Sequence, residues 1–253
     1  MCLIALAWQV SPSYPLLVAA NRDERHARAT APARWWLDRP EIFGGRDLTA
    51  GGTWLAVDRR GRLAAVTNFR DGTPLAGLRS RGALVTGFLE QRGSAADFEA
   101  AITPELHEYG PFNLLLFDGE QLRYVSNRAP ARRLTPGIHA LSNTALGSDW
   151  PKTRSAAAGM ELALGTADPA EALLTLLARR APGALEETYR SAHFIEGEVY
   201  GTRSSTVVLL DASGRLTFVE RSFDAAARVT GEVRETFTLA RGGSTAQASE
   251  HLL

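Results

Sequence analysis

The chain opens with Met1-Cys2-Leu3-Ile4-Ala5-Leu6-Ala7-Trp8, an apolar strand pattern directly behind a cysteine. A small residue at position two normally permits removal of the initiator methionine, which would leave Cys2 with a free α-amine. An α-amine has a pKa of about 8, so it can accept the proton of the thiol on the same residue. Cys2 is equally compatible with a small apolar residue that opens a buried strand. The rest of the chain has to separate these two interpretations.

Length and composition exclude several classes of protein. The chain has 253 residues, with 28 Lys and Arg balanced by 28 Asp and Glu. This zero net charge argues against nucleic-acid binding or a membrane-surface patch. Cys2 is the only cysteine, so an internal disulfide and a multi-cysteine zinc site are excluded, and we predict no metal site. No apolar run approaches the roughly 20 residues of a membrane span and no signal sequence is present, so we expect a cytoplasmic protein without an integral membrane segment.

Strand and helix patterns follow one another in blocks. We predict helices over Arg81–Gln91, Ala95–Ile102, Pro151–Leu164 and Pro169–Arg180. The predicted strands are Cys2–Val10, Pro15–Asn21, Trp54–Asp58, Leu63–Phe69, Phe112–Phe117, Leu122–Ser126, Ile138–Leu141, Thr206–Leu210, Leu216–Glu220 and Glu232–Thr238. Hairpins separated by helical pairs favour an α+β architecture of antiparallel sheets covered by helices.

The chain shows no internal repeat and no long linker. We therefore predict a single domain over residues 1–241, followed by a flexible C-terminal tail over residues 242–253, which are mostly small and polar. The Arg- and Ala-rich stretch Arg25–Arg34 is predicted to be a surface loop.

Polar residues gather where four predicted strands end or begin. The clusters are Asn21-Arg22-Asp23-Glu24-Arg25, Thr67-Asn68, Leu141-Ser142-Asn143-Thr144 and Tyr200-Gly201-Thr202-Arg203-Ser204-Ser205-Thr206. Each alone is more often a turn, a helix cap or a surface ion pair than a catalytic group. Four such clusters have no common reason to exist unless they meet, so we predict that they surround one pocket at the ends of the central strands.

Several short motifs occur together in an order typical of one family. They are Met1-Cys2-Leu3-Ile4, Ala19-Ala20-Asn21-Arg22-Asp23-Glu24, Gly51-Gly52-Thr53-Trp54-Leu55, Ala65-Val66-Thr67-Asn68, Ser80-Arg81-Gly82, Leu134-Thr135-Pro136-Gly137, Leu141-Ser142-Asn143, Gly201-Thr202-Arg203-Ser204-Ser205-Thr206 and Glu220-Arg221-Ser222. The chain resembles the NRDE family, which is named after the tetrapeptide at Asn21 and whose eukaryotic members are called transport and Golgi organisation protein 2. The resemblance runs from Met1 to about Arg221.

Through that family the chain resembles the N-terminal nucleophile hydrolases of the penicillin V acylase and bile salt hydrolase type. The resemblance implies a four-layer αββα sandwich, with two antiparallel sheets between helical layers. It also implies a catalytic cysteine, an Arg and an Asp after the second strand, two later asparagines and a late arginine. The residues that follow this order here are Cys2, Arg22, Asp23, Asn68, Asn143 and Arg203.

One departure from the pattern of those hydrolases affects the site. They separate the Arg and the Asp by two residues, whereas Arg22 and Asp23 are adjacent and would point to opposite faces of a strand. Unless the strand ends or bulges there, either Asn21 with Asp23, or Arg22 alone, lines the pocket. We keep Asn21 and Arg22 as candidate substrate-binding residues.

The residue types suggest hydrolysis of an amide or a thioester through an acyl-enzyme. Cys2 would be the nucleophile, and its α-amine would accept the thiol proton. Asp23 would hold that amine by a charge-assisted hydrogen bond. This reaction requires no cofactor, and its partner is a small-molecule amide or thioester.

Two further kinds of group complete the expected chemistry. Asn143, with Asn68, would donate hydrogen bonds to the oxyanion. Arg203 or Arg22 is expected to lower the pKa of the Cys2 thiol and to hold an anionic leaving group or a substrate carboxylate.

A non-catalytic carrier is the competing function class. Members of the resembling family are linked to haem trafficking and to lipid or acyl-CoA metabolism, so the same pocket could carry haem, acyl-CoA or a lipid-like ligand without turnover. The candidate axial ligands for haem are Cys2, His26, His139 and His193. A carrier should tolerate a retained Met1, whereas a hydrolase of this type requires its removal.

Overall fold

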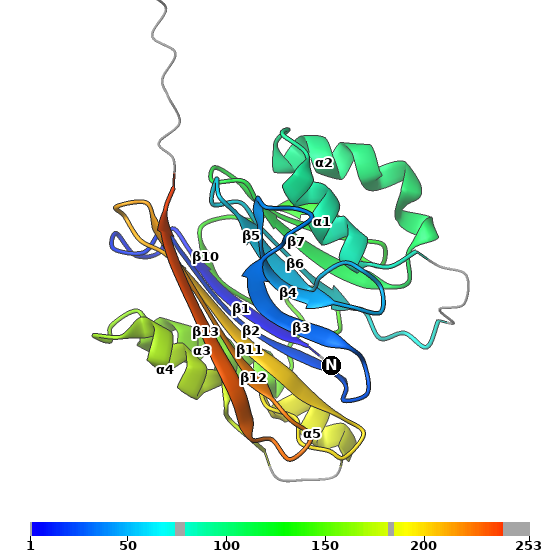
Figure 1. The fold of residues 1–253 in the computed structure, drawn as a ribbon, viewed down its shortest axis with the longest axis vertical. Helices are drawn as coiled ribbons and strands as arrows, with labels where there is room; N and C mark the ends of the chain where they lie inside the picture. The colour runs from blue at the N-terminus through cyan, green and yellow to red at the C-terminus, as the bar shows by residue number, and fades with distance from the viewer. Residues whose placement is uncertain (1, 74–78, 182–184, 240–253) are drawn as a thin grey trace, which may run out of the picture.

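Two antiparallel sheets form the centre of the molecule (Figure 1). The computed structural model describes residues 2–73, 79–181 and 185–239, so all of the predicted tail lies outside the described residues. Within them, no helix is long and apolar enough to cross a membrane.

The described strands divide into two sheets. The first has the order β10-β1-β2-β11-β12-β13, with β10 at Gly137–Leu141, β1 at Leu3–Trp8, β2 at Leu16–Arg25, β11 at Tyr200–Leu210, β12 at Arg215–Phe223 and β13 at Val229–Thr238. The second has the order β3-β4-β5-β6-β7-β8-β9, with β3 at Thr30–Trp35, β4 at Ile42–Asp47, β5 at Leu55–Asp58, β6 at Leu63–Asn68, β7 at Phe112–Phe117, β8 at Leu122–Ser126 and β9 at Arg132–Arg133.

Helices cover the outer face of each sheet (Figure 1). The second sheet carries α1 (Gly82–Glu90) and α2 (Ala95–Ile102), which continues into the 3-10 helix η1 (Thr103–Glu108). The first sheet carries α3 (Pro151–Ala163) and α4 (Pro169–Leu177), and α5 (Leu185–Ser191) lies beside α3. The predicted α+β, four-layer αββα sandwich is therefore confirmed.

Strand alternation produces three apolar layers. In β1, Ile4, Leu6 and Trp8 point between the sheets, while Leu3 and Ala5 pack against α3 and α4. The same alternation in β2 sends its even-numbered apolar side chains between the sheets and its odd-numbered ones to the helices. A third layer lies between the second sheet and α1. Both faces of the two central strands are therefore buried, which explains their continuous apolar sequence.

The prediction of a loop over Arg25–Arg34 was wrong, and strand β4 was not predicted. Strand β2 continues to Arg25, and β3 begins at Thr30. Strand β3 lies at a sheet edge with an irregular register between Ala31 and Arg34, around Pro32, which an edge strand tolerates. Strand β4 contains Gly44, where a Cβ would lie only 2.7 Å from the Leu55 carbonyl oxygen. Close packing therefore requires a glycine at this position, and the sequence lacks the β-branched residue that would have indicated a strand.

Candidate active site

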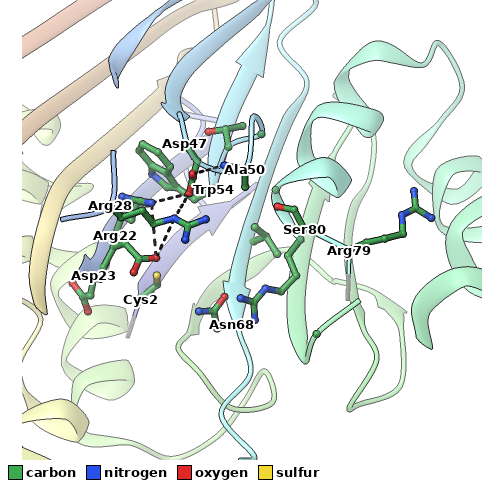
Figure 2. A pocket seen from close by; sticks show the side chains of 17 residues that line it. Cys2, Arg22, Asp23, Arg28, Asp47, Ala50, Trp54, Asn68, Arg79 and Ser80 are labelled. Carbon is green, nitrogen blue, oxygen red and sulfur yellow. Dashed lines mark hydrogen bonds and ion pairs between the residues drawn. The ribbon is translucent and has the colours of Figure 1, made fainter. Parts of the chain in front are cut away.

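A cavity of about 260 Å³ opens between the sheets at the end where β1 begins (Figure 2). Its walls come from the polar end of β2, the β4–β5 connection, the end of β6 and the start of α1. The lining residues are Cys2, Arg22, Asp23, Glu24, Arg28, Asp47, Ala50, Gly52, Thr53, Trp54, Val66, Asn68, Arg79, Ser80, Arg81, Gly82 and Gly110. We call this space the Cys2 cavity.

Cys2 occupies the end of a central strand. Strand β1 pairs with β2 in a register that places Leu3 opposite Asn21, so Cys2 lies next to Arg22 and Asp23. The residue as a whole is half-buried, but its sulfur is enclosed and the Asp23 backbone forms a hydrogen bond to it. Burial raises the pKa of the Cys2 thiol above its ordinary value, and the positive charge of Arg22 opposes this only in part. Arg22 therefore lowers that pKa as expected, but burial has the larger effect, and Arg203 does not contribute.

Arg22 points between the sheets and is held on several sides. Its guanidinium lies 3.2 Å from Asp47 Oδ2 and donates to Thr30 Oγ1, also at 3.2 Å. It stacks over the Trp54 ring at 4.3 Å, and Arg28 shares the same Asp47 oxygen at 2.6 Å (Figure 2). Burial lowers the pKa of Arg22, and the carboxylates around it oppose that effect. The side chain is thus a fixed cation at the cavity wall.

Asp23 points to the opposite side of β2, toward the helices. Thr202 Oγ1 donates to Asp23 Oδ1 at 2.7 Å, and the Tyr200 hydroxyl donates to the Asp23 carbonyl at 2.9 Å. Burial raises the pKa of the Asp23 carboxyl, while Lys152 and the Thr202 hydrogen bond oppose the rise. Arg22 and Asp23 therefore both line the cavity, from opposite faces of β2, because β1 begins only at Leu3 and leaves this end of the sheet open. This differs from the expectation that only one of the two would line the pocket.

A bulge in β11 places the partner of Asp23. The β2–β11 register shifts between Thr202 and Ser204, with Thr202 opposite Asp23 and Ser204 opposite Arg22. The additional residue is Arg203, whose Nη1 donates to the carbonyl oxygens of Arg25, His26 and Arg28 at 2.9–3.1 Å. Arg203 is therefore not among the described residues that line the Cys2 cavity, and it supports the β2–β3 connection instead.

Asn21 also lies outside the cavity. It is 1% exposed on the helix-facing side of β2, where its Nδ2 donates to the carbonyls of Leu177 and His193 at 2.9 and 2.8 Å. Ser205 Oγ donates to Asn21 Oδ1 at 2.6 Å. These contacts fasten the helical layer to β2 and do not place Asn21 for substrate binding.

The two other asparagines lie together, with different exposure. The Asn68 side chain lines the cavity across from Cys2 (Figure 2). Asn143 is buried behind it, and its Nδ2 donates to the Asn68 carbonyl at 2.7 Å. The neighbouring Ser142 hydroxyl donates to the Cys2 carbonyl at 2.9 Å. The segment after β10 therefore links the start of β1 to the end of β6, and Asn68 is the asparagine that faces the cavity.

Lys152 is a buried lysine near the site that the sequence interpretation missed. It is 1% exposed at the second position of α3. Burial lowers the pKa of Lys152, and the charges of Asp23 and Cys2 oppose the decrease. Nothing in the sequence marks this lysine, because a Lys after a helix-starting Pro is ordinary; only the packing of α3 on β1 brings it to Asp23.

Other lining residues were part of motifs but had no assigned role. Arg81, at the start of α1, donates to the Pro111 carbonyl at 3.2 Å and makes no ion pair with a carboxylate in the described part of the chain. The pair Gly51-Gly52 has a steric purpose: Gly51 has a φ of +79°, and a Cβ on Gly52 would lie 2.6 Å from the Gly82 carbonyl carbon. The β4–β5 connection can therefore press against α1 and close the cavity wall.

The three histidines that were candidate haem ligands form hydrogen bonds within the protein, away from the Cys2 cavity. His26 Nε2 contacts the Gly197 carbonyl at 2.8 Å, and His139 Nε2 contacts the Thr135 carbonyl at 2.9 Å. His193 is buried, with Nδ1 on the Leu176 carbonyl and Nε2 on the Ser155 hydroxyl. None of the three lines the Cys2 cavity, and the described residues contain no group of three or more His, Cys, Asp or Glu that could hold a metal ion.

The sequence matches the family model described as Transport and Golgi organisation 2 over residues 1–225. The chain belongs to this family. It is 33% identical to the human Transport and Golgi organization protein 2 homolog and 32% identical to the mouse homolog, in each case over 88% of this chain and 93% of the relative. The Drosophila melanogaster Transport and Golgi organization protein 2 is 24% identical, over 88% of this chain and 92% of the relative.

Two solved structures share part of the layout. The Caenorhabditis elegans N-acylethanolamine-hydrolyzing acid amidase ortholog matches with a TM-score of 0.45 and 10% identity, over 83% of this chain and 92% of that chain. The Cys2-to-Ala mutant of conjugated bile acid hydrolase from Clostridium perfringens matches with a TM-score of 0.49 and 11% identity, over 96% of this chain and 100% of that chain. At these scores the similarities carry no inference about activity.

Proposed function

We propose that this chain is an N-terminal-cysteine hydrolase that cleaves a small-molecule amide or thioester through an acyl-enzyme. The observation that carries the proposal is the placement of Cys2. The only thiol of the chain lines a cavity at the junction of the two sheets, between a buried arginine and a buried aspartate. A structural cysteine would instead be expected to pack inside one of the apolar layers.

The reaction begins with removal of Met1, which is part of the proposal. The freed α-amine of Cys2 accepts the thiol proton while the sulfur attacks the substrate carbonyl carbon. The carbon–nitrogen or carbon–sulfur bond then breaks, and the leaving group takes a proton from the ammonium. Water attacks the resulting thioester, which releases a carboxylic acid and restores the thiol. Transfer of the proton during the attack suits a thiol whose pKa is raised by burial.

The surrounding residues have complementary roles in this scheme. Asp23 holds the α-ammonium, and protonation of Lys152 favours the ionised form of Asp23. The side chain of Asn68 is the candidate donor to the oxyanion, because Asn143 already donates to the Asn68 carbonyl. Arg81 and the fixed guanidinium of Arg22 favour a substrate that carries an anionic group.

Two measurements test the proposal. The intact mass of the purified protein should show loss of Met1. Hydrolysis of a panel of acyl aminocoumarin amides and acyl thioesters should then be absent in Cys2→Ala and reduced to a trace in Cys2→Ser, which keeps the amine. Ser80→Ala, in the same cavity, is the matched control and should retain most of the activity. Turnover by Cys2→Ala equal to that of the unmodified chain would refute the proposal.

The second candidate function is binding of an anionic ligand such as an acyl-CoA or haem without turnover. The observation that favours it is Arg81, whose guanidinium faces the Cys2 cavity without an ion-paired carboxylate among the described residues. A carrier would retain ligand affinity with Met1 attached and in Cys2→Ala, and would lose it in Arg81→Ala. For either function we propose the cytoplasm as the compartment, because thiols remain reduced there.

A further inference from the structure

A second cavity of about 260 Å³ shares Trp54 with the Cys2 cavity. We call it the side cavity. It lies between the sheets, enclosed by β3, β11, β12 and β13, and its principal lining residues are Pro32, Trp54, Arg203, Ser204, Glu220 and Phe223. Neither the proposed hydrolysis nor the carrier function uses it.

Two bulges shape the side cavity. The β11 bulge between Thr202 and Ser204 forms one border, and a register shift in the β12–β13 pair between Ser222 and Phe223 forms another. Strand alternation points Ser204, Glu220 and Ser222 between the sheets, on the same side as the central apolar layer. Bulges are enriched beside binding sites because they re-aim side chains at the end of a regular ladder.

Ser204 gives the first sign that the side cavity binds a ligand. The residue is 4% exposed, and its hydroxyl oxygen is buried without a hydrogen-bond partner among the described residues. Leaving a buried hydroxyl without a partner costs about 1–3 kcal/mol. A ligand that accepts or donates a hydrogen bond there would recover this cost.

Glu220 gives the second sign. It is 2% exposed, its Oε1 accepts from the Ala33 N–H at 2.7 Å, and its Oε2 accepts weakly from the Thr206 hydroxyl at 3.3 Å. Burial raises the pKa of Glu220 to about 7, so near neutral pH much of the carboxyl is protonated and can donate a hydrogen bond.

The charged groups around Glu220 favour an anionic ligand. Arg22 faces Glu220 from β2, and Arg203 lines the cavity from β11. Glu232 lines it from β13, but its charge is paired with Arg221 at 2.8 Å. The charge of Arg22 is paired with Asp47 at 3.2 Å, whereas Arg203 donates to carbonyl oxygens and makes no ion pair with a carboxylate among the described residues. The charge of Arg203 beside a partly protonated carboxyl therefore leaves the site positive, and Pro32 and the aromatic rings offer apolar contact.

We propose that the side cavity binds a short-chain monocarboxylic acid, with its carboxylate beside Ser204, Glu220 and Arg203 and its carbon chain against Trp54 and Phe223. A volume of about 260 Å³ suits a ligand of roughly eight non-hydrogen atoms, given about 30 Å³ for each atom of water size. Hexanoate has this size. The site does not depend on hydrolysis at Cys2.

Titration of the full-length protein with sodium hexanoate, followed by calorimetry and by tryptophan fluorescence, tests the proposal. Saturable binding is expected, and hexanol should bind at least ten-fold more weakly because it lacks the anion. Ser204→Ala should weaken hexanoate binding about ten-fold, which corresponds to one lost hydrogen bond of about 1.4 kcal/mol. Thr236→Val, on the exposed side of β13, is the matched control and should bind like the unmodified chain.

A blocking variant locates the site. Gly231 lies opposite Ser222 in β13, and a Cβ there meets nothing within 4 Å, so Gly231→Leu should fold and abolish hexanoate binding. Binding should weaken between about pH 6 and pH 8 as Glu220 ionises, and Glu220→Gln should remove that dependence. Cys2→Ala should leave hexanoate affinity unchanged. Absence of saturable binding, equal binding of hexanol, or retained binding in a folded Gly231→Leu would each overturn the proposal.

Discussion

The two halves of strand β2 are buried in different ways. Residues 16–20 are apolar and fill the layers on both faces of the strand. Residues 21–23 are polar and equally enclosed, at 1%, 5% and 4% exposure, but each needs specific partners: carbonyl groups for Asn21, Asp47 for Arg22 and Thr202 for Asp23. Strand alternation sends the apolar side chains of residues 16–20 to two different core layers. In the polar half, Asn21 makes structural contacts with the helical layer, whereas Arg22 and Asp23 line the Cys2 cavity.

The comparison predicts that changes in the polar half affect chemistry more than stability. Asp23→Asn should lower the rate of the proposed hydrolysis roughly 10³-fold, because a neutral amide holds the α-ammonium less well. The rate of substrate hydrolysis, measured on protein whose fold is verified by circular dichroism, checks this. A loss of less than about ten-fold would show that Asp23 does not hold the amine.

In the apolar half the expectation is reversed. Leu17→Ala should lower the free energy of unfolding by about 2–5 kcal/mol, because it leaves a cavity between β2 and α4. The rate per folded molecule should stay within about three-fold of the unmodified chain. Urea unfolding followed by tryptophan fluorescence gives the first quantity, and active-site titration gives the second. An activity loss comparable to that of Asp23→Asn would remove the distinction between the halves.

The polar region between the sheets should also make stability depend on pH. The folded Glu220 carboxyl binds its proton more tightly than the unfolded one, since burial raises its pKa from 4.5 to about 7. Its contribution to stability is therefore complete below about pH 4.5 and is lost as the pH rises to about 7, a decrease of about 3 kcal/mol. Glu220→Gln should flatten this part of the stability curve. An unchanged slope in that variant would assign the dependence to other groups.

The smallest expected effect concerns the reactivity of the thiol. Because burial raises the pKa of Cys2, alkylation by iodoacetamide at pH 7 should be slower than that of free cysteine and should still accelerate above pH 9. Arg22→Gln removes a neighbouring positive charge and should slow alkylation further, by up to about ten-fold. Rates measured across pH by intact mass check both statements. Alkylation faster than that of free cysteine at pH 7 would contradict the dominance of burial.

The parts of the fold that could be predicted are those that residues close together in the sequence specify. Helix α2 has the predicted bounds because Ser94 and Asp97 form a capping box, a signal written in adjacent residues. Strands β3 and β4 were missed because Pro32, Gly44 and Gly45 weaken the strand pattern, and only pairing in the sheet makes these segments extended. Periodicity therefore identified the central strands but not the irregular ones.

The site shows the same limit. Cys2, Arg22, Asp23 and Asn68 were found as motif residues next to strand ends, and they line the cavity. The positions of Asn21, Asn143 and Arg203 depend on side-chain direction, which the β11 bulge and the segment after β10 determine. Asp47 and Lys152 carry no signal in the sequence, because long-range packing brings them to the site.

The order of strands in the first sheet has a consequence during synthesis. Strand β1 is made first, yet its neighbours are β2 and β10, and β2 in turn pairs with β11 at Tyr200–Leu210. At about 5–20 residues per second, the ribosome needs roughly 10–35 s to reach β11 after β2 has emerged. Throughout this time the segment that contains Cys2 has not yet been joined by all the strands of its sheet. The N-terminus is therefore accessible to enzymes that trim nascent chains. The sheet that carries Cys2 is complete only after nearly the whole chain has been made.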